Sequence, residues 1–263
     1  MGDRARPLAG RTVLVTRPAR RGGKLARRLE ALGAVVEVRP TIALETPSDP
    51  APARRAVRRL GEFDWIVFTS ANGVRFFLAR LREAGSRVAD VRARIASLGP
   101  ATGAVLEESG LKPARTAEQP TAEGLAATLR DAVEGRRVLV VGPEVSRPVL
   151  ADALRDAGAE IEAVAFYRNV AAEGVDDVAE RVCRGCYDVV VFTSPSTLHR
   201  LIEGGWSPRS QVLRALGDAD LVAIGAVTAQ AIVELGLRVS ATAATPSDDG
   251  IVRAVCALYD GGG

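Results

Sequence analysis

The sequence predicts an α/β protein made of two similar units, each built around a doubly wound parallel sheet. Two observations predict this class. Short apolar runs rich in β-branched residues alternate with helical patterns along the 263 residues, which is typical of parallel strands connected by helices. The series of elements then occurs a second time, most clearly at residues 64–74 and 188–198. A repeat that extends along the chain indicates a duplicated unit.

Each element of the first copy has its own local signal. Strands are runs of Val, Ile, Leu and Phe, whereas helices carry apolar residues three or four positions apart, as at Leu25, Leu29 and Leu32. Gly33 ends the first helix, and Thr121 is the expected N-cap of the last. The predicted elements are a strand and turn at 10–18, a helix at 24–32, a strand at 35–38, a proline-containing linker at 43–53, a helix at 53–60, a strand from 64 with a helix after its turn, a strand and glycine turn at 95–102, a helix through 106–109, a strand at 112–116 and a helix opened by 120–121.

The second copy repeats these elements at nearly constant spacing. Four further segments match their counterparts, namely 135–143 with 10–18, 154–159 with 29–34, 222–228 with 96–102, and 246–251 with 120–125. We therefore expect the same order of strands and helices in both copies, with equivalent strand-end loops facing a shared cleft.

Polar residues follow the central strand in both copies. Thr69, Ser70 and Asn72 stand after the first strand, and Thr193, Ser194 and Ser196 after the second. In open α/β sheets, ligands bind at the carboxyl ends of the strands. The helix that begins there also presents unpaired backbone N–H groups, which suit an anionic ligand.

The composition is that of a globular protein without a nucleic-acid surface. Hydrophobic residues make up 47% and charged residues 25%, a normal balance. The first residues lack the apolar core of a signal peptide and no apolar run has membrane-spanning length, so we expect a cytoplasmic protein without membrane partners. The arginines are scattered along helices and aromatic residues are 4%, which argues against a nucleic-acid partner but leaves a groove for a polyanionic small molecule open.

The motifs of common cofactor and nucleophile chemistries are missing from the sequence. There is no P-loop, and no glycine-rich dinucleotide fingerprint follows a strand. Cys183 and Cys186 form a CxxC without a second pair, and His199 is the single histidine, so a zinc site or a Ser-His-Asp arrangement is not predicted. We interpret the CxxC as structural and His199 as a partly exposed helix residue. The remaining option is a site of hydroxyls and backbone N–H groups that holds a reactive substrate in one conformation.

Six short segments occur in a fixed order along the chain. They are Val15-Thr16-Arg17-Pro18, Phe68-Thr69-Ser70-Ala71-Asn72-Gly73-Val74, Ser97-Leu98-Gly99-Pro100-Ala101-Thr102, Phe166-Tyr167-Arg168, Phe192-Thr193-Ser194-Pro195-Ser196, and Ile224-Gly225 with Thr228. In this order they resemble the uroporphyrinogen-III synthase family. The resemblance covers residues 10 to about 258. Each segment alone is unspecific, whereas the ordered set is much more specific.

The resemblance implies an arrangement that the repeat alone does not. The repeat by itself suggests two consecutive domains. The family instead has two similar flavodoxin-like domains facing a cleft, one inserted in the other and joined by two linker strands. Carried over here, residues 1–40 and 168–263 form a discontinuous domain, and 41–167 form the inserted domain.

The resemblance also implies a reaction. The substrate is hydroxymethylbilane, a linear tetrapyrrole with eight carboxylates, which is closed into uroporphyrinogen III with inversion of ring D. Loss of the terminal hydroxyl as water gives an azafulvene cation, and a spiro intermediate then rearranges. Neither a metal nor an organic cofactor is implied. We expect a monomer that receives its substrate, in a transient hand-over, from the deaminase that makes it.

The resemblance assigns one catalytic residue and a set of binding positions. Tyr167 matches the tyrosine proposed to assist departure of the hydroxyl, although a strand-end tyrosine can also simply pack. Hydroxyls at the binding positions can equally cap helices, and the two arginines can equally be solvated. Ala226 departs from the family, which often has proline there. The implied substrate-binding residues are Thr16, Arg17, Thr69, Ser70, Asn72, Gly99, Thr102, Gly142, Arg168, Thr193, Ser194, Ser196, Gly225 and Thr228.

Two other functions are compatible with such a fold. A non-catalytic module could sense a tetrapyrrole or polycarboxylate, as domains of this family do when attached to regulators. The sequence shows no helix-turn-helix segment before Gly263, which favours the enzyme. A two-domain periplasmic binding protein would require a signal peptide.

Overall fold

The computed structural model describes residues 6–17 and 19–260. The chain divides into two compact units. Unit 1 combines the residues up to Ala43 with those from Val170 onward, and unit 2 comprises Leu44–Asn169. Pro18, in the turn after the first predicted strand, lies outside the described residues, as do both ends of the predicted discontinuous domain.

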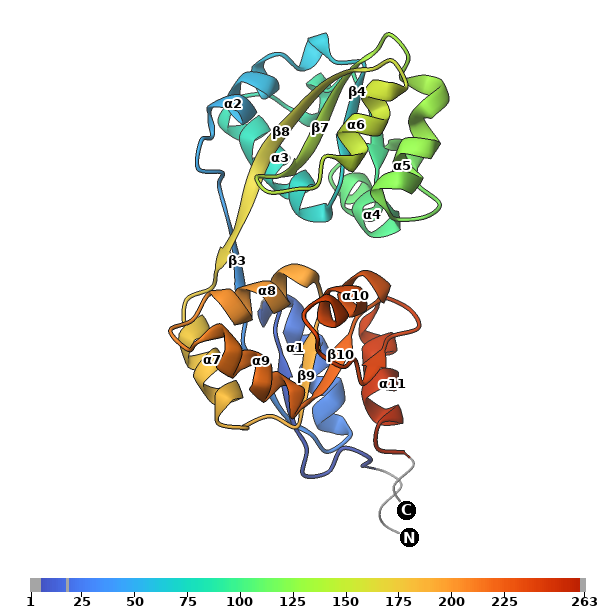
Figure 1. The fold of residues 1–263 in the computed structure, drawn as a ribbon. Helices are drawn as coiled ribbons and strands as arrows, with labels where there is room; N and C mark the ends of the chain where they lie inside the picture. Colours follow the sequence, from blue (N-terminus) through green and yellow to red (C-terminus); the bar gives the residue numbers. More distant parts are fainter. Residues whose placement is uncertain (1–5, 18, 261–263) are drawn as a thin grey trace. The chain divides into compact units, whose positions relative to one another are not determined.

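Unit 1 is a five-stranded parallel sheet with helices on both faces (Figure 1). The strand order is β11-β10-β9-β1-β2, the doubly wound order of flavodoxin-like folds. The strands are β1 (Thr12–Val15), β2 (Val35–Val38), β9 (Val189–Phe192), β10 (Asp220–Ala223) and β11 (Ala241–Thr242). The helices are α1 (Ala19–Ala31), α7 (Val175–Cys183), α8 (Pro195–Glu203), α9 (Arg209–Gly217), α10 (Ala226–Glu234) and α11 (Asp248–Ala257).

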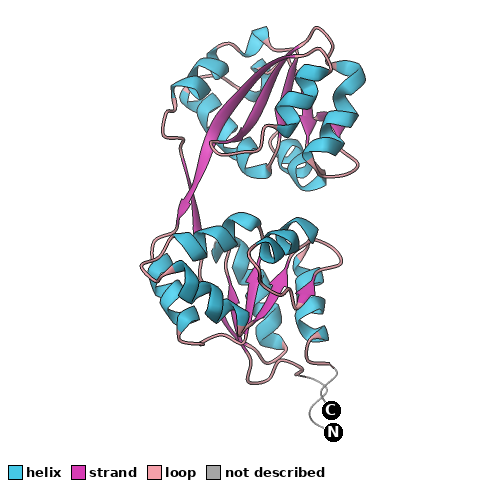
Figure 2. Cartoon of the chain, in the orientation of Figure 1, coloured by secondary structure: helices cyan, strands magenta, loops and turns pink. Residues whose placement is uncertain are grey.

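Unit 2 has the same architecture with one strand added at its edge. The order is β3-β8-β7-β4-β5-β6, and helices again cover both faces (Figure 2). The strands are β3 (Ile42–Glu45), β4 (Trp65–Phe68), β5 (Arg94–Ser97), β6 (Pro113–Thr116), β7 (Arg137–Pro143) and β8 (Glu160–Ala171). The helices are α2 (Ala51–Arg58), α3 (Ala71–Glu83), α4 (Pro100–Glu108), α5 (Ala122–Leu129) and α6 (Val149–Asp156), with 3₁₀ turns at Leu60–Glu62, Val88–Asp90 and Arg130–Ala132.

The two sequence copies are interlaced between the units. β1 and β2 of the first copy pair with β9, β10 and β11 of the second, whereas β7 and β8 of the second pair with β4, β5 and β6 of the first. Each sheet is therefore completed by strands from the other copy. The two copies therefore do not form two consecutive domains, and the prediction from the repeat alone is wrong. Local sequence patterns identify the strands, but they do not show which strands pair with each other.

The chain crosses between the units along β3 and β8, which are hydrogen-bonded neighbours. The two segments run in opposite directions. Arg168 pairs with Glu45 at 2.8 Å, and further along the chain the Ala172 N–H donates to the carbonyl of the earlier residue Thr41 at 3.1 Å. The two crossings are thus hydrogen-bonded to each other.

Helix boundaries differ slightly from the expected ones. α1 begins at Ala19 rather than Lys24, and α2 ends at Arg58, before the 3₁₀ turn that begins at Leu60. Gly22 and Gly23 weaken the sequence pattern of α1, since glycine disfavours helix interiors. Thr121 does cap α5, its Oγ1 accepting the Gly124 N–H at 3.0 Å, so this prediction is confirmed.

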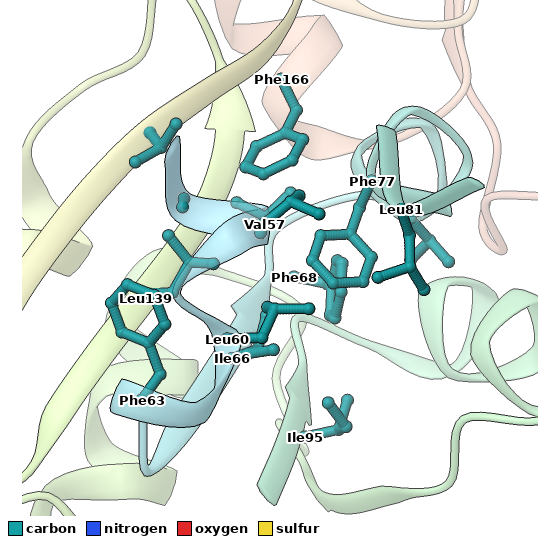
Figure 3. Packing of buried hydrophobic residues seen from close by; sticks show 14 of the residues in the cluster. Val57, Leu60, Phe63, Ile66, Phe68, Phe77, Leu81, Ile95, Leu139 and Phe166 are labelled. Carbon is teal, nitrogen blue, oxygen red and sulfur yellow. The ribbon is translucent and has the colours of Figure 1, made fainter. Parts of the chain in front are cut away.

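Each sheet separates two apolar clusters. In unit 2, Phe68, Phe77 and Phe166 lie in one cluster, and Trp65 and Val67 lie in the other. Figure 3 shows the first of them, where the ring of Phe166 on β8 approaches Phe77 of α3, with centroids 5.6 Å apart. The alternation along β4 follows from the pleat of a strand buried on both faces.

An aspartate precedes the central strand in each unit and binds the neighbouring strand. Asp188 Oδ2 accepts the Thr12 N–H at 2.8 Å, and Asp64 Oδ2 accepts the Arg137 N–H at 2.9 Å. Both aspartates thus satisfy a strand-end donor that the parallel ladder leaves unpaired. The equivalence shows that the repeat extends to side-chain contacts.

Candidate active site

The turn after β4 is fixed by two hydroxyl groups. Thr69 Oγ1 donates to the Val141 carbonyl at 3.1 Å and so holds the end of β4 to β7. Ser70 is the N-cap of α3, its Oγ accepting the Gly73 N–H at 3.0 Å. Serine is favoured there because its oxygen satisfies one of the four unpaired N–H groups of the first helical turn.

Tyr167 is held against the beginning of α3. Its hydroxyl lies 2.9 Å from Ser70 Oγ, and its ring stacks on Phe76 with centroids 5.5 Å apart. The side chain is 5% exposed. Burial raises the pKa of the Tyr167 hydroxyl, and the hydrogen bond with Ser70 opposes part of that rise. The group is therefore a phenol, not a phenolate, near neutral pH.

A bulge in the β7–β8 ladder explains this orientation. Gly142 pairs with Ala165, but Pro143 pairs with Tyr167, so the register shifts by one residue. Successive side chains of a regular strand point to opposite faces. Here Phe166 and Tyr167 both contact α3, through Phe77 and Phe76. The bulge thus directs the tyrosine to the carboxyl edge of the sheet, a role bulges often have at functional sites.

The other predicted residues of unit 2 lie on the same edge of the sheet. Asn72 is in the first turn of α3, and its Oδ1 accepts from Arg75 at 3.4 Å. Gly142 lies in β7 beside Thr69, whose Oγ1 would be 3.5 Å from a Cβ at that glycine. Gly99 is the N-cap of α4, and buried Thr102 lies in the first turn of that helix.

Unit 1 places its predicted residues at the equivalent edge. Thr16 is fully buried, and its Oγ1 donates to the Val191 carbonyl at 2.9 Å. Ser194 caps α8 through the Thr197 N–H at 3.3 Å. Thr193 precedes this cap and Ser196 follows it within the first turn. Gly225 is the N-cap of α10, with buried Thr228 in its first turn.

The two predicted arginines are engaged by acids of their own units. Arg17 pairs with Asp248 at the first turn of α11. Arg168 donates to Glu45 Oε2 at 2.8 Å and to Ser48 Oγ at 2.9 Å. The Nε of each arginine is buried and has no hydrogen-bond partner. Both guanidinium groups are therefore oriented but not fully satisfied.

The predicted residues form two groups, one on the carboxyl edge of each sheet. Direct side-chain contact joins Tyr167 to Ser70. Sequence reasoning missed three partners, namely Phe76, Asp248 and Glu45. Acids after the N-cap Ser247 are a recognisable helix-start signal, but nothing local indicates that Asp248 meets Arg17, 231 residues away.

Within residues 6–17 and 19–260, no three His, Cys, Asp or Glu side chains are grouped to hold a metal ion. Cys183 and Cys186 are free thiols at the end of α7 and just after it, packed against an apolar cluster. Among the same residues, no helix has both the length and the apolar character needed to cross a membrane.

Comparison with known sequences gives a consistent result. The family described as uroporphyrinogen-III synthase HemD matches residues 23–253. The chain is 29% identical over 258 residues to uroporphyrinogen-III synthase of Synechococcus elongatus, covering 95% of this chain and 96% of that protein. It is 29% identical over 235 residues to uroporphyrinogen-III synthase of Chlorobaculum parvum, covering 87% and 91%.

Solved structures are similar along the same length. A mutant uroporphyrinogen III synthase of the extremely thermophilic bacterium Thermus thermophilus superposes with a TM-score of 0.72 at 23% identity, covering 95% of this chain and 98% of that one. The Helicobacter pylori protein gives 0.59 at 16% identity, covering 94% and 99%. The predicted fold class, two doubly wound α/β units with one inserted in the other, is confirmed.

Proposed function

The chain belongs to the uroporphyrinogen-III synthase family, and from this premise we propose that it closes hydroxymethylbilane into uroporphyrinogen III, with loss of water and inversion of ring D. The observation that carries the proposal is the buried Tyr167 hydroxyl, held 2.9 Å from Ser70 at the carboxyl edge of the unit 2 sheet. Such edges are the usual ligand sites of doubly wound sheets.

The substrate's carboxylates suit the helix N-termini at these edges. The first turn of a helix presents unpaired N–H groups that bind anions. In the proposal, the first turns of α3 and α4 offer such groups at the sheet edge of unit 2, and those of α8 and α10 offer them at the sheet edge of unit 1, beside the hydroxyls of Thr193 and Ser196. The Thr69 hydroxyl, whose proton is donated to Val141, fixes the turn before α3. Gly99 and Gly225, at the N-caps of α4 and α10, leave the approach to these N–H groups open.

Tyr167 is assigned the role of acid for the departing hydroxyl. Ser70 Oγ already accepts the Gly73 N–H, so its own proton is free to donate to the tyrosine oxygen. The phenol proton then points to substrate. As the C–O bond of the hydroxymethyl group breaks, the pyrrole nitrogen supplies the electron pair and the hydroxyl leaves as water with the tyrosine's proton. The raised pKa keeps that proton in place before the reaction.

Arg17 and Arg168 are assigned to bind substrate carboxylates, which would take over part of the hydrogen bonding that each arginine now gives to an acid of the protein. Each carries a buried Nε without a partner, and each is paired with an acid at a helix start or strand end. An arriving carboxylate would share the guanidinium fork, which can bind more than one oxygen pair. The acids hold the forks in place while the site is empty.

The test is a coupled assay with a matched set of variants. Porphobilinogen and a hydroxymethylbilane-forming deaminase are mixed with the protein, and the oxidised porphyrins are separated by isomer. We expect isomer III in excess of the spontaneous isomer I. Tyr167→Phe should lower the rate about 100-fold, the lower range for loss of a general acid.

Ser70→Ala should lower the rate about tenfold by releasing the tyrosine, whereas Ser70→Thr should retain activity. Thr121→Ala removes an N-cap of the same geometry from α5 in the same unit, at a similar cost of about 1 kcal/mol. It should leave the isomer III rate unchanged. Isomer I alone, from folded protein, would reject the synthase in favour of the ligand-sensing module.

The proposal extends to the partners. We propose that the chain acts as a monomer and accepts hydroxymethylbilane directly from the deaminase, because the substrate cyclises spontaneously to isomer I when released. Gel filtration of the protein, alone and with the deaminase, tests both statements.

A further inference from the structure

A hollow lies at the end of the unit 2 sheet where β4 and β5 begin, opposite the edge that carries Tyr167. Its volume is about 710 Å³, within the range of small-molecule sites. Four arginines line it, namely Arg92, Arg94, Arg115 and Arg136. The proposed substrate site is at the other end of these strands, so the hollow is a separate feature.

Two of these arginines are already neutralised. Arg115 binds Asp131 through two hydrogen bonds of 2.9 and 3.1 Å, and it also donates to the Thr128 carbonyl at 2.7 Å. Arg136 lies 3.3 Å from Asp64, which also accepts the Arg137 N–H. Their charges therefore contribute little net potential.

The other two arginines are available. Arg92 and Arg94 are exposed, and neither forms a salt bridge within the described part of the chain, although the charge of Arg94 adds to that of Arg115 in lowering the pKa of Asp131. The Arg94 guanidinium lies 4.3 Å above the ring of Trp65, whose indole N–H donates to the Ala132 carbonyl at 3.2 Å. Stacking on an aromatic face orients a guanidinium and leaves its N–H edge free. Glu134 is the one carboxylate of the lining without a described partner, so the unpaired charge is positive.

The internal repeat shows that the fold does not require these arginines. In unit 1, the positions equivalent to Arg92 and Arg94 are Asp218 and Asp220. The Tyr259 hydroxyl donates to Asp220 at 2.6 Å, and the corresponding hollow is only about 270 Å³. The same strand start thus carries acids beside a small hollow in one unit and unpaired arginines beside a large one in the other.

We propose that this hollow in unit 2 binds a small anion with two or more carboxylate or phosphate groups, using Arg92 and Arg94. Both groups present oxygen pairs that match the guanidinium fork. An anion bridging the two arginines would give both of them an ion-pair partner. The Trp65 ring under Arg94 would shield one face of that guanidinium from water. This site does not depend on the proposed synthase activity.

Calorimetric titration of the intact protein at low salt tests the proposal, with citrate and inorganic tripolyphosphate as separate probes. We expect at least one probe to bind with a stoichiometry of one; which of the two binds more tightly distinguishes a carboxylate from a phosphate ligand. Arg92→Asp/Arg94→Asp, which introduces the unit 1 residue type, should weaken binding at least tenfold.

The matched control is Arg54→Asp/Arg55→Asp on the exposed face of α2. This variant changes the net charge by the same amount, and it should bind the probes as tightly as the native protein does. Binding of neither probe to the native protein would overturn the proposal, as would equal weakening in both double variants. If circular dichroism shows the Asp variant to be unfolded, Arg92→Gln/Arg94→Gln must show the same loss.

Discussion

Gly99 and Gly225 occupy equivalent positions at the N-caps of α4 and α10, yet their surroundings differ. Both have extended backbone that any residue can adopt. A Cβ at Gly99 would lie 2.8 Å from Pro120 Cβ, whereas one at Gly225 would lie 4.0 Å from Pro246 Cβ. The first distance is too short for two carbon atoms, and the proline ring has little freedom to move.

We therefore expect Gly99→Ala to destabilise the protein by about 1 to 3 kcal/mol, the usual cost of overpacking. Gly225→Ala should change stability by less than about 0.5 kcal/mol. Urea unfolding of both variants measures the difference. Equal effects at the two sites would show that Pro120 moves away.

At the scale of elements, Glu62 connects the 3₁₀ turn after α2 to β7. Its carboxylate binds Arg59 at 2.8 Å and Arg137 at 2.7 Å. These hydrogen bonds, first that of Arg59 and then that of Arg137, lower the pKa of Glu62 from 4.5 to about 2. A carboxyl group with a lowered folded-state pKa stabilises the fold above its unfolded pKa and loses that contribution as pH falls toward the folded value.

Glu62→Gln should thus be less stable than the native protein at pH 6, and the difference should shrink as pH falls from about 4.5 toward 2. Urea midpoints measured at several pH values check this. Glu107→Gln, which alters an exposed carboxylate of α4 without a described partner, should show no such trend. If the difference in stability between Glu62→Gln and the native protein did not change with pH, the ion pairs assigned to Glu62 would be contradicted.

The elements themselves are the part of the fold that sequence predicts best. Buried strands such as β4 and β9 are continuous apolar runs, and the N-cap Thr121 has a local signal that the structure confirms. α9 is absent from the predicted elements, and the first copy has only the 3₁₀ turn Val88–Asp90 in its place. The bulge that turns Tyr167 toward Ser70 depends on a contact between residues 97 positions apart, which no local pattern encodes.

At the scale of the molecule, unit 2 is contiguous and unit 1 is not. Residues 44–169 contain β4 to β7, nearly all of β8 and half of β3, with the whole of the apolar clusters on both faces of the sheet. Residues 170–263 lack β1, α1 and β2, and with them the buried Val13, Val15 and Leu29 of one apolar cluster of unit 1. We expect the fragment 44–169 to fold by itself with a cooperative urea transition, because it retains its whole core.

The fragment 170–263 should not unfold cooperatively, since β9 would lose its neighbour and become an uncovered edge. A permuted chain supplies the control. Arg11 lies over the ring of Tyr259, 4.4 Å from its centroid, so a short Gly/Ser linker can join the end of 170–263 to residue 6 of a 6–43 segment. This chain should regain the transition. Cooperative unfolding of 170–263 alone would show that β1 and β2 are dispensable.

The placement of β1 between β2 and β9 also has a consequence for biosynthesis. Thr16 bonds to a carbonyl 175 residues further along the chain. At about 5 to 20 residues per second, its partner emerges from the ribosome roughly 10 to 35 seconds later. Unit 2 has all its strands before Val191 emerges and can begin to fold first, while β1 has β2 beside it but still lacks β9. We therefore expect the nascent chain to expose its N-terminal segment to holding chaperones for longer than its middle.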